Sequence, residues 1–121
     1  MNARSSGSVV MVVEDELMIA STLEMALESK GYQVLGPVAT VDEALELLET
    51  SFPDIALSDF RLAETTTEAL LPSLDSRHIP VGVLTGYSAS QLPAAYAGYA
   101  VLEKPFSRDA LIAAIEQIKS D

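Results

Sequence analysis

Five residues of this chain carry the oxygen and nitrogen atoms that phosphoryl chemistry requires. Adjacent carboxyl groups occur at Glu14 and Asp15, and a further carboxyl group occurs at Asp59. A hydroxyl group at Thr85 and an ammonium group at Lys104 complete the set. In a chain with no Cys and a single His, clustered carboxylates suit a hard cation such as Mg²⁺. A carboxylate can also act as a nucleophile that forms an acyl phosphate, whose oxygens a Lys and a Thr can bind.

A short, mainly apolar run precedes each of these groups, and the first run, residues 9–13, is unbroken and rich in β-branched residues. Such unbroken runs are typical of strands that are buried on both faces of a parallel sheet. Because ligand sites in open α/β sheets form at the carboxyl ends of the strands, we expect the five residues to converge on one crevice. The four runs are residues 9–13, 54–58, 80–84 and 100–102, and residues 33–35 form a fifth, weaker candidate strand.

Helical periodicity separates the candidate strands. Thr40 to Glu43 and Ser88 to Gln91 match the capping box, and Ser107 can cap the last helix. The chain therefore alternates strand and helix five times, which predicts an α/β fold with a parallel sheet and helices on both of its faces. The expected helices span residues 19–27, 41–48 and 64–75, then a short helix begins at Ser88 and a last one at Ser107.

The length and the composition fit one domain. Domains commonly have about 100–150 residues, and this chain has 121, of which 49% are hydrophobic. We expect residues 1–7 to be a disordered N-terminus and residues 8–120 to form the domain. A net charge of −11 disfavours nucleic acid and anionic membranes as partners. Since no apolar run approaches the ~20 residues of a membrane span and no secretory signal is evident, we expect a cytoplasmic protein.

Each candidate site residue also has an ordinary structural explanation. Acidic residues such as Glu14 and Asp15 are common at helix N-termini, where they suit the helix dipole. Asp59 could be a turn residue or an N-cap, and Thr85 could belong to a simple turn. Lys104 could be a solvated surface residue. Any one of these signals is weak alone, but their occurrence on successive strand ends favours a common site.

In combination, the motifs resemble the receiver domain of two-component response regulators over about residues 8–120. Residues 12–16 (Val-Val-Glu-Asp-Glu) resemble the acidic pair of that family, and residues 53–59 (Pro-Asp-Ile-Ala-Leu-Ser-Asp) resemble its phosphoacceptor strand. Thr85 matches the hydroxyl residue that closes on the phosphoryl group, and residues 104–106 match the Lys-Pro-Phe signature, whose Lys-Pro bond is usually cis. The resemblance implies a flavodoxin-like (βα)5 fold, doubly wound, with five parallel strands in the order 2-1-3-4-5.

The same resemblance implies a role for each site residue. Asp59 would be the phosphoacceptor, while Thr85 and Lys104 would bind the phosphoryl oxygens. Asp15 and Asp59 would be metal ligands for Mg²⁺. Two further contributions to the metal site are implied, one through water from Glu14 and one from the backbone carbonyl of Arg61.

The chain departs from the usual family pattern in two places. Val101 stands three residues before Lys104, where the family usually has an aromatic switch residue, and Tyr99 is a possible substitute. Residues 84–87 (Leu-Thr-Gly-Tyr) resemble a subfamily with a Thr-Gly-bulky motif, the FATGUY type, which also lacks the aromatic residue on strand five. Members of that subfamily resemble partners of an atypical histidine kinase class. The usual Pro-Gly turn after the phosphoacceptor is also replaced, by residues 62–66.

The expected function is that of a phosphoacceptor receiver, which takes a phosphoryl group from a histidine kinase or a phosphotransfer protein. It would catalyse its own phosphorylation and dephosphorylation, and would switch a protein–protein contact with an unidentified output protein at the fourth helix and fifth strand. Tyr87, Tyr96 and Tyr99 cluster there and fit either the edge of the core or a partner-binding face. Two alternatives are a pseudo-receiver that is never phosphorylated and a small phosphatase with an Asp nucleophile. The phosphatase would need an acid where Arg61 stands.

Overall fold

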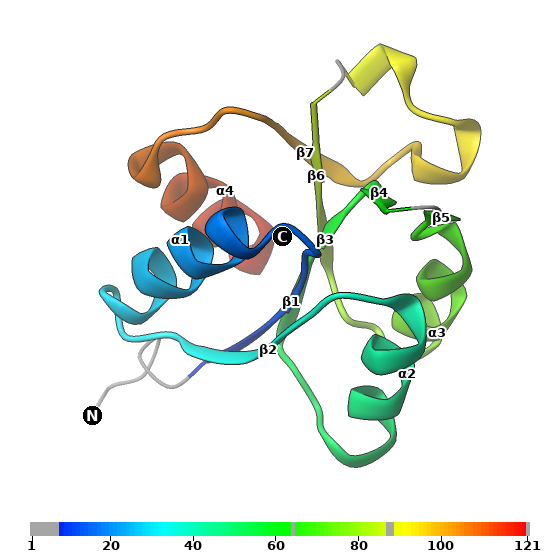
Figure 1. The fold of residues 1–121 in the computed structure, drawn as a ribbon, viewed down its shortest axis with the longest axis horizontal. Coiled ribbons are helices and arrows are strands. Elements are labelled where there is room, and N and C mark those ends of the chain that lie inside the picture. The colour runs from blue at the N-terminus through cyan, green and yellow to red at the C-terminus, as the bar shows by residue number, and fades with distance from the viewer. Residues whose placement is uncertain (1–7, 64, 87–88, 121) are drawn as a thin grey trace.

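The computed structural model describes residues 8–63, 65–86 and 89–120, so the N-terminus predicted to be disordered (residues 1–7) lies outside the described residues. Its centre is a five-stranded parallel sheet in the order β2-β1-β3-β6-β7 (Figure 1). This is the predicted 2-1-3-4-5 order, because two extra short strands intervene in the numbering, and the fold class is thereby confirmed. The strands are β1 (Val9–Val13), β2 (Gln33–Val38), β3 (Ile55–Asp59), β6 (Val81–Thr85) and β7 (Ala100–Glu103).

The register of the parallel strands brings their carboxyl ends to one edge. Every residue of the central strands β3 and β6 is buried, as their unbroken apolar sequences predict, whereas the edge strands β2 and β7 are partly exposed. Asp59 pairs with Leu84 on β6, and Thr85 pairs with Glu103 on β7. Each strand therefore ends within about one residue of its neighbour, and the polar residues that follow the strands share this edge.

Two layers of helix cover the sheet (Figure 1). On one face, α1 (Leu17–Glu28) and α4 (Arg108–Ser120) bury Leu23, Leu27 and Ile115 against the side chains of β1 and β3. On the other face, α2 (Val41–Thr50) and α3 (Leu71–Ser76) bury Leu48 and Leu74 in a second cluster. Among the described residues, no helix has the length and apolar character needed to cross a bilayer.

Two of the predicted capping residues, Thr40 and Ser107, cap helices in the structure. The backbone N–H of Glu43 donates to Thr40 Oγ1 at 3.0 Å, which starts α2. The Glu43 carboxylate reaches back to the N–H of Ala39, at 2.9 Å, one residue before the group that a standard capping box uses. The N–H of Ala110 donates to Ser107 Oγ at 3.0 Å, so Ser107 caps α4 as expected.

The predicted helix over residues 64–75 is wrong at its start. Here the chain forms a small antiparallel hairpin of β4 (Arg61–Leu62) and β5 (Thr65–Thr66), then the 3₁₀ turn η1 (Glu68–Leu70), and α3 begins only at Leu71. The β-branched Thr residues favour the extended form, and the N–H of Thr67 donates to the carbonyl of Phe60 at 3.0 Å. This hydrogen bond, between residues seven positions apart, outweighs the helical spacing of the apolar residues.

The predicted fourth helix is also wrong within the described residues. Residues 89–99, here called the 89–99 segment, contain two 3₁₀ turns, η2 (Ala89–Gln91) and η3 (Ala94–Tyr96), and no α-helix. Pro93 lies between the turns; it has no N–H to donate and disfavours helical geometry in the residue before it. The predicted capping residue Ser88 lies outside the described residues, as does Tyr87.

Candidate functional site

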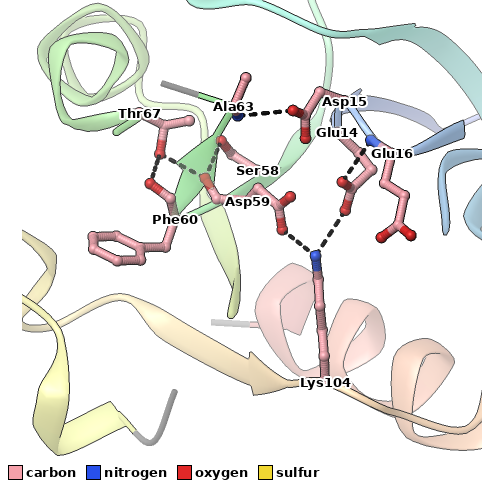
Figure 2. A network of polar contacts seen from close by, with 9 residues as sticks. All are labelled: Glu14, Asp15, Glu16, Ser58, Asp59, Phe60, Ala63, Thr67 and Lys104. Carbon is pink, nitrogen blue, oxygen red and sulfur yellow. Dashed lines mark hydrogen bonds and ion pairs between the residues drawn. The ribbon is translucent and has the colours of Figure 1, made fainter. Parts of the chain in front are cut away.

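Lys104 joins two carboxylates at the carboxyl edge of the sheet (Figure 2). Its Nζ lies 2.7 Å from Asp59 Oδ1, at the end of β3, and 3.0 Å from Glu14 Oε1, directly after β1. Both carboxylates are buried, and the Lys104 side chain is largely so. Buried carboxylates require a partner, so the single ammonium group holds together two strand ends that are 45 residues apart in sequence.

The charges at this site are unbalanced. Glu14, Asp15 and Asp59 each place a carboxylate oxygen within 4.8 Å of the others, and Lys104 is the cation that contacts two of them. Burial, followed by the hydrogen bond with Glu14, raises the pKa of Asp59 to about 8, and the nearby Lys104 only partly opposes this. Burial acts to lower the pKa of Lys104, but its bonds to Asp59 and Glu14 prevail and raise it. The cluster therefore has room for another positive charge.

Backbone N–H groups hold the side chains of Asp15 and Glu14 in place. Asp15 Oδ2 accepts a hydrogen bond of 2.8 Å from the N–H of Ala63, in the hairpin that follows Asp59 (Figure 2). Glu14 Oε2 accepts one of 3.1 Å from the N–H of Glu16. Ala63 has a φ of +34°, a backbone conformation that places its N–H in the tight turn of the hairpin. The hairpin thus fixes the orientation of the acidic pair.

A small hollow of about 130 Å³ opens beside these groups. Thr85, the last residue of β6, is buried at its wall, and the carbonyl of Thr85 accepts a 2.7 Å hydrogen bond from the N–H of Lys104. The structure thus brings Asp59, Thr85 and Lys104 around one space, next to Glu14 and Asp15. The Lys104-Pro105 peptide bond is cis, as the resemblance implied. The hollow is lined by Asp59, Phe60, Arg61, Leu84, Thr85, Gly86 and Lys104.

Sequence analysis missed two hydroxyl groups that contact the backbone of Asp59, of which Ser58 Oγ donates to its carbonyl at 3.0 Å. Thr67 Oγ1 donates to the Asp59 carbonyl at 2.6 Å and lies 3.0 Å from the hydroxyl of Tyr96. Thr67 belongs to a run of three Thr residues that looked like an uncertain helix start, and only the spacing of this run from Asp59 could have drawn attention to it. Tyr96 is buried, which places it in the core, whereas Tyr99 is half-buried and donates to Asp75 Oδ2 at 2.6 Å.

The chemistry of the donor set fits a hard divalent cation. Every candidate ligand atom in the acidic cluster is a carboxylate oxygen, and the excess negative charge favours binding of a cation. A cation, a Lys and a Thr around a carboxylate are the groups that stabilise a phosphoryl group in transfer reactions. The arrangement therefore has the groups needed to hold a phosphoryl group next to a carboxylate oxygen of Asp59.

The fold and this edge of the sheet define a class, the doubly wound α/β domains with an acidic site at the strand ends. Within that class, the family model for the response regulator receiver domain matches residues 10–116. The chain belongs to the response regulator receiver domain family, and the predicted family is confirmed.

Known relatives agree with this family. The chain is 36% identical over 111 residues to the transcriptional regulatory protein PdtaR of Mycobacterium tuberculosis; the match covers 88% of this chain and 54% of PdtaR. The chain thus spans about half the length of that relative. It is also similar to the crystal structure of a CheY-like receiver domain from Methanospirillum hungatei, with a TM-score of 0.84, 27% identity and 95% coverage of both chains.

A third similar structure was solved with a metal ion. The receiver domain of the sensor histidine kinase PA1611 from Pseudomonas aeruginosa has a magnesium ion coordinated in its active site cleft. It matches with a TM-score of 0.82 and 25% identity, over 95% of this chain and 99% of that one.

Proposed function

We propose that Asp59 accepts a phosphoryl group from a histidine kinase or a phosphotransfer protein in a reaction that depends on Mg²⁺. The observation that carries the proposal is the Lys104 bridge, which holds Asp59 beside two further carboxylates at the wall of a hollow. In the transfer, an Asp59 carboxylate oxygen forms a bond to phosphorus while the bond from phosphorus to the donor nitrogen breaks. The electron pair of that bond stays on the donor imidazole. The product is an acyl phosphate, which water later hydrolyses to free Asp59 and phosphate.

The residues around Asp59 would bind the metal ion and the phosphoryl oxygens. Asp15 and Asp59 would hold Mg²⁺ directly, Glu14 through water, and the Arg61 backbone carbonyl would add a ligand. The ion would neutralise charge on the phosphoryl oxygens. Lys104, released from its bridge, would bind one of these oxygens with its ammonium group. The hydroxyl of Thr85 would bind another, because Thr85 stands across the same hollow.

The apolar exposed end of α1 fits a docking surface for the phosphoryl donor. Leu17, Met18 and Met25 are 82%, 80% and 71% exposed, which is unusual for large apolar side chains. A cavity of about 390 Å³ is lined by two other residues of α1, Ile19 and Thr22, and by Lys104. Since Lys104 also lines the phosphoacceptor hollow, a donor seated on α1 would have its reactive group close to Asp59.

Two finer features belong to the same proposal. The Thr85-Gly86 pair and the absence of an aromatic residue at Val101 favour the subfamily with the Thr-Gly-bulky motif and, with it, a kinase of the atypical class. The output partner would bind at the 89–99 segment and β7, where a groove of about 330 Å³ is lined by residues such as Leu92 and Val101. The protein would act in the cytoplasm.

The test is intact mass spectrometry after incubation with acetyl phosphate and Mg²⁺. We expect the parent protein to gain one phosphoryl group and Asp59→Asn to gain none. Asp54→Asn is the matched control, because Asp54 directly precedes β3 and so lies at the opposite end of the strand from Asp59. Its carboxylate accepts a 2.7 Å hydrogen bond from the N–H of Val9. Asp54→Asn should gain the group as the parent does.

Two results would contradict the proposal in different ways. Phosphorylation that persists in Asp59→Asn would place the acceptor elsewhere. No gain in the parent, together with NMR spectra that do not respond to Mg²⁺, would favour the pseudo-receiver, which uses the fold only as a binding scaffold. A response to Mg²⁺ without a mass gain calls for a repeat with phosphorylated kinase as donor, and failure there also contradicts the proposal.

A further inference from the structure

Tyr96 is a buried anchor in an exposed stretch of chain. Its side chain is 2% exposed, whereas Ala94, Ala95, Ala97 and Gly98 around it are exposed. The ring packs edge-on against Phe60, with ring centroids 5.2 Å apart and an angle of 85° between the planes. Phe60 directly follows the phosphoacceptor Asp59. The 89–99 segment is therefore attached, through one aromatic residue, to the end of the strand that carries the acceptor.

A chain of hydroxyl groups runs from Tyr96 to the backbone of Asp59. Thr67 has one hydroxyl proton, and its shortest bond, 2.6 Å, uses this proton on the Asp59 carbonyl (Figure 2). Thr67 Oγ1 must then accept in its 3.0 Å contact with the Tyr96 hydroxyl, which is the donor. The Tyr96 hydroxyl also lies near the Phe60 carbonyl, farther away at 3.5 Å, and near the side chain of Thr66. Thr67, Asp59 and Tyr96 are all buried, so the hydrogen bonds between them are shielded from water.

A second Tyr attaches the same segment to a different place. Tyr99 donates to Asp75 Oδ2 at 2.6 Å, and Asp75 lies in α3. This bond is exposed and reaches no group at the end of β3. The 89–99 segment thus has two phenol anchors of similar chemistry, of which Tyr96 contacts the acceptor strand and Tyr99 does not. The half-buried Val101 on β7 has no polar side-chain atom that could make such a bond.

We propose that Tyr96 is a positioning residue, which transmits the phosphorylation state of Asp59 to the 89–99 segment through Thr67. The inference rests on the proposed function of Asp59. Any displacement of the Asp59 carbonyl when the side chain is phosphorylated alters its short bond to Thr67, and the partner of Thr67 is the phenol that anchors the segment. The segment then moves, or loosens, as one unit around Tyr96.

The test compares amide NMR spectra with and without beryllofluoride, which mimics an acyl phosphate in the presence of Mg²⁺. In the parent, the amides of residues 94–99 should shift on addition of the mimic. Tyr96→Phe keeps the ring but removes the donor, and Thr67→Val keeps the shape but removes the hydroxyl. Each should reduce the shifts of residues 94–99 by about fivefold, as the loss of one buried hydrogen bond would do. Tyr99→Phe, the matched control, should leave the shifts of residues 94–97 unchanged.

Signals at the site itself separate a failure of this inference from a failure of the proposed function. The amides of Thr85 and Lys104 report binding of the mimic and should shift in the parent and in all three variants. If they shift while residues 94–99 respond equally in the parent and in Tyr96→Phe, Tyr96 does not transmit the signal. If Tyr99→Phe weakens the response as much as Tyr96→Phe does, the segment senses any loosening and the specific path is wrong. If the site amides never shift, it is the phosphoacceptor function that fails.

Discussion

The two faces of the sheet are covered in different ways. On one face lie α1 and α4, regular helices of 12 and 13 residues whose buried side chains form one continuous cluster. On the other face, α2 has 10 residues and α3 only six, and the remaining cover comes from 3₁₀ turns. A 3₁₀ turn has poorer hydrogen-bond geometry than an α-helix. The comparison indicates one face covered by regular helices and one face covered in part by short turns, which we expect to rearrange more easily.

The candidate site lies across this division. Glu14 and Asp15 lead into α1, and Lys104 comes shortly before α4, so the charged groups are connected to the regular face. Thr67 and Tyr96 lie on the irregular face, behind the backbone of Asp59. The groups that would bind metal and phosphoryl oxygens need fixed positions, whereas a segment that reports phosphorylation must be able to move. We expect the face with α1 and α4 to keep the binding groups in fixed positions, and the face with α2 and α3 to allow movement.

Truncation of one buried side chain on each face should give very different losses of stability. Ile115 on α4 is fully buried, and Ile115→Ala should lower the free energy of unfolding by about 3 kcal/mol, through lost apolar burial and the cavity that remains. Leu92, in the 89–99 segment, is only partly buried, and Leu92→Ala should cost less than about 1 kcal/mol. Urea unfolding measures both. Equal losses would mean that the 89–99 segment is as tightly packed as α4.

Removal of the bridging cation should strengthen metal binding at the acidic cluster. Lys104→Met keeps an unbranched apolar stem but leaves Glu14 and Asp59 without their ammonium partner. We expect the affinity for Mg²⁺ to rise by about tenfold, since one positive charge no longer competes with the ion. Calorimetric titration measures the affinity. Lys119→Met is the control, because Lys119 contacts the Tyr32 ring near the end of α4 and not the cluster.

An unchanged or lower affinity in Lys104→Met would show that Lys104 organises the carboxylates instead of competing with the ion. The two variants should otherwise keep the same far-UV circular dichroism, which checks that the sheet is intact.

The raised pKa of Asp59 predicts how stability depends on pH in metal-free buffer. Its pKa is about 8 in the folded protein and near the ordinary value of 3.8 when unfolded, so between these values the folded state binds more protons. The contribution of Asp59 to stability is therefore fully present below about pH 4 and is lost as the pH rises toward 8. From pH 5 to 8, the stability of the parent should fall relative to that of Asp59→Asn by about 3 kcal/mol, which lowers the unfolding midpoint by roughly 12 °C.

Thermal unfolding in the presence of a chelator, followed by circular dichroism, measures this difference. Parallel pH profiles for the parent and Asp59→Asn would mean that Asp59 is already ionised at pH 5. The raised pKa of Lys104 does not affect this window, because its loss of charge would occur at higher pH.

The sequence was sufficient for the parts of the fold that depend on local patterns. The strands β1, β3 and β6 are unbroken apolar runs, and the residues after them stand at one edge simply because parallel strands end together. Thr40 and Ser107 cap their helices through bonds that span only three residues. Such features need no knowledge of distant contacts.

The errors occur where distant contacts decide the local structure. Residues 65–67 form a strand end and a turn because Thr67 bonds to Phe60 and Asp59, and no helical periodicity contains that information. The 89–99 segment carries apolar residues at helical spacing, but Pro93 limits hydrogen bonding and the buried Tyr96 fixes the chain from the side. Both errors concern the irregular face, where tertiary bonds replace regular backbone bonds.

The order of the strands in the sheet has a consequence for synthesis of the chain on the ribosome. β1 is made first, yet its two neighbours are β2 and β3, and β6 and β7 join the sheet only afterwards. A chain released before residue 100 would have three carboxylates at the strand ends without Lys104, and β6 would be an unpaired edge. Uncompensated buried charge and an open strand edge both disfavour a folded product. Incomplete chains are therefore expected to remain unfolded and accessible to proteases, so that only chains extended through β7 and Lys104 persist in the folded state.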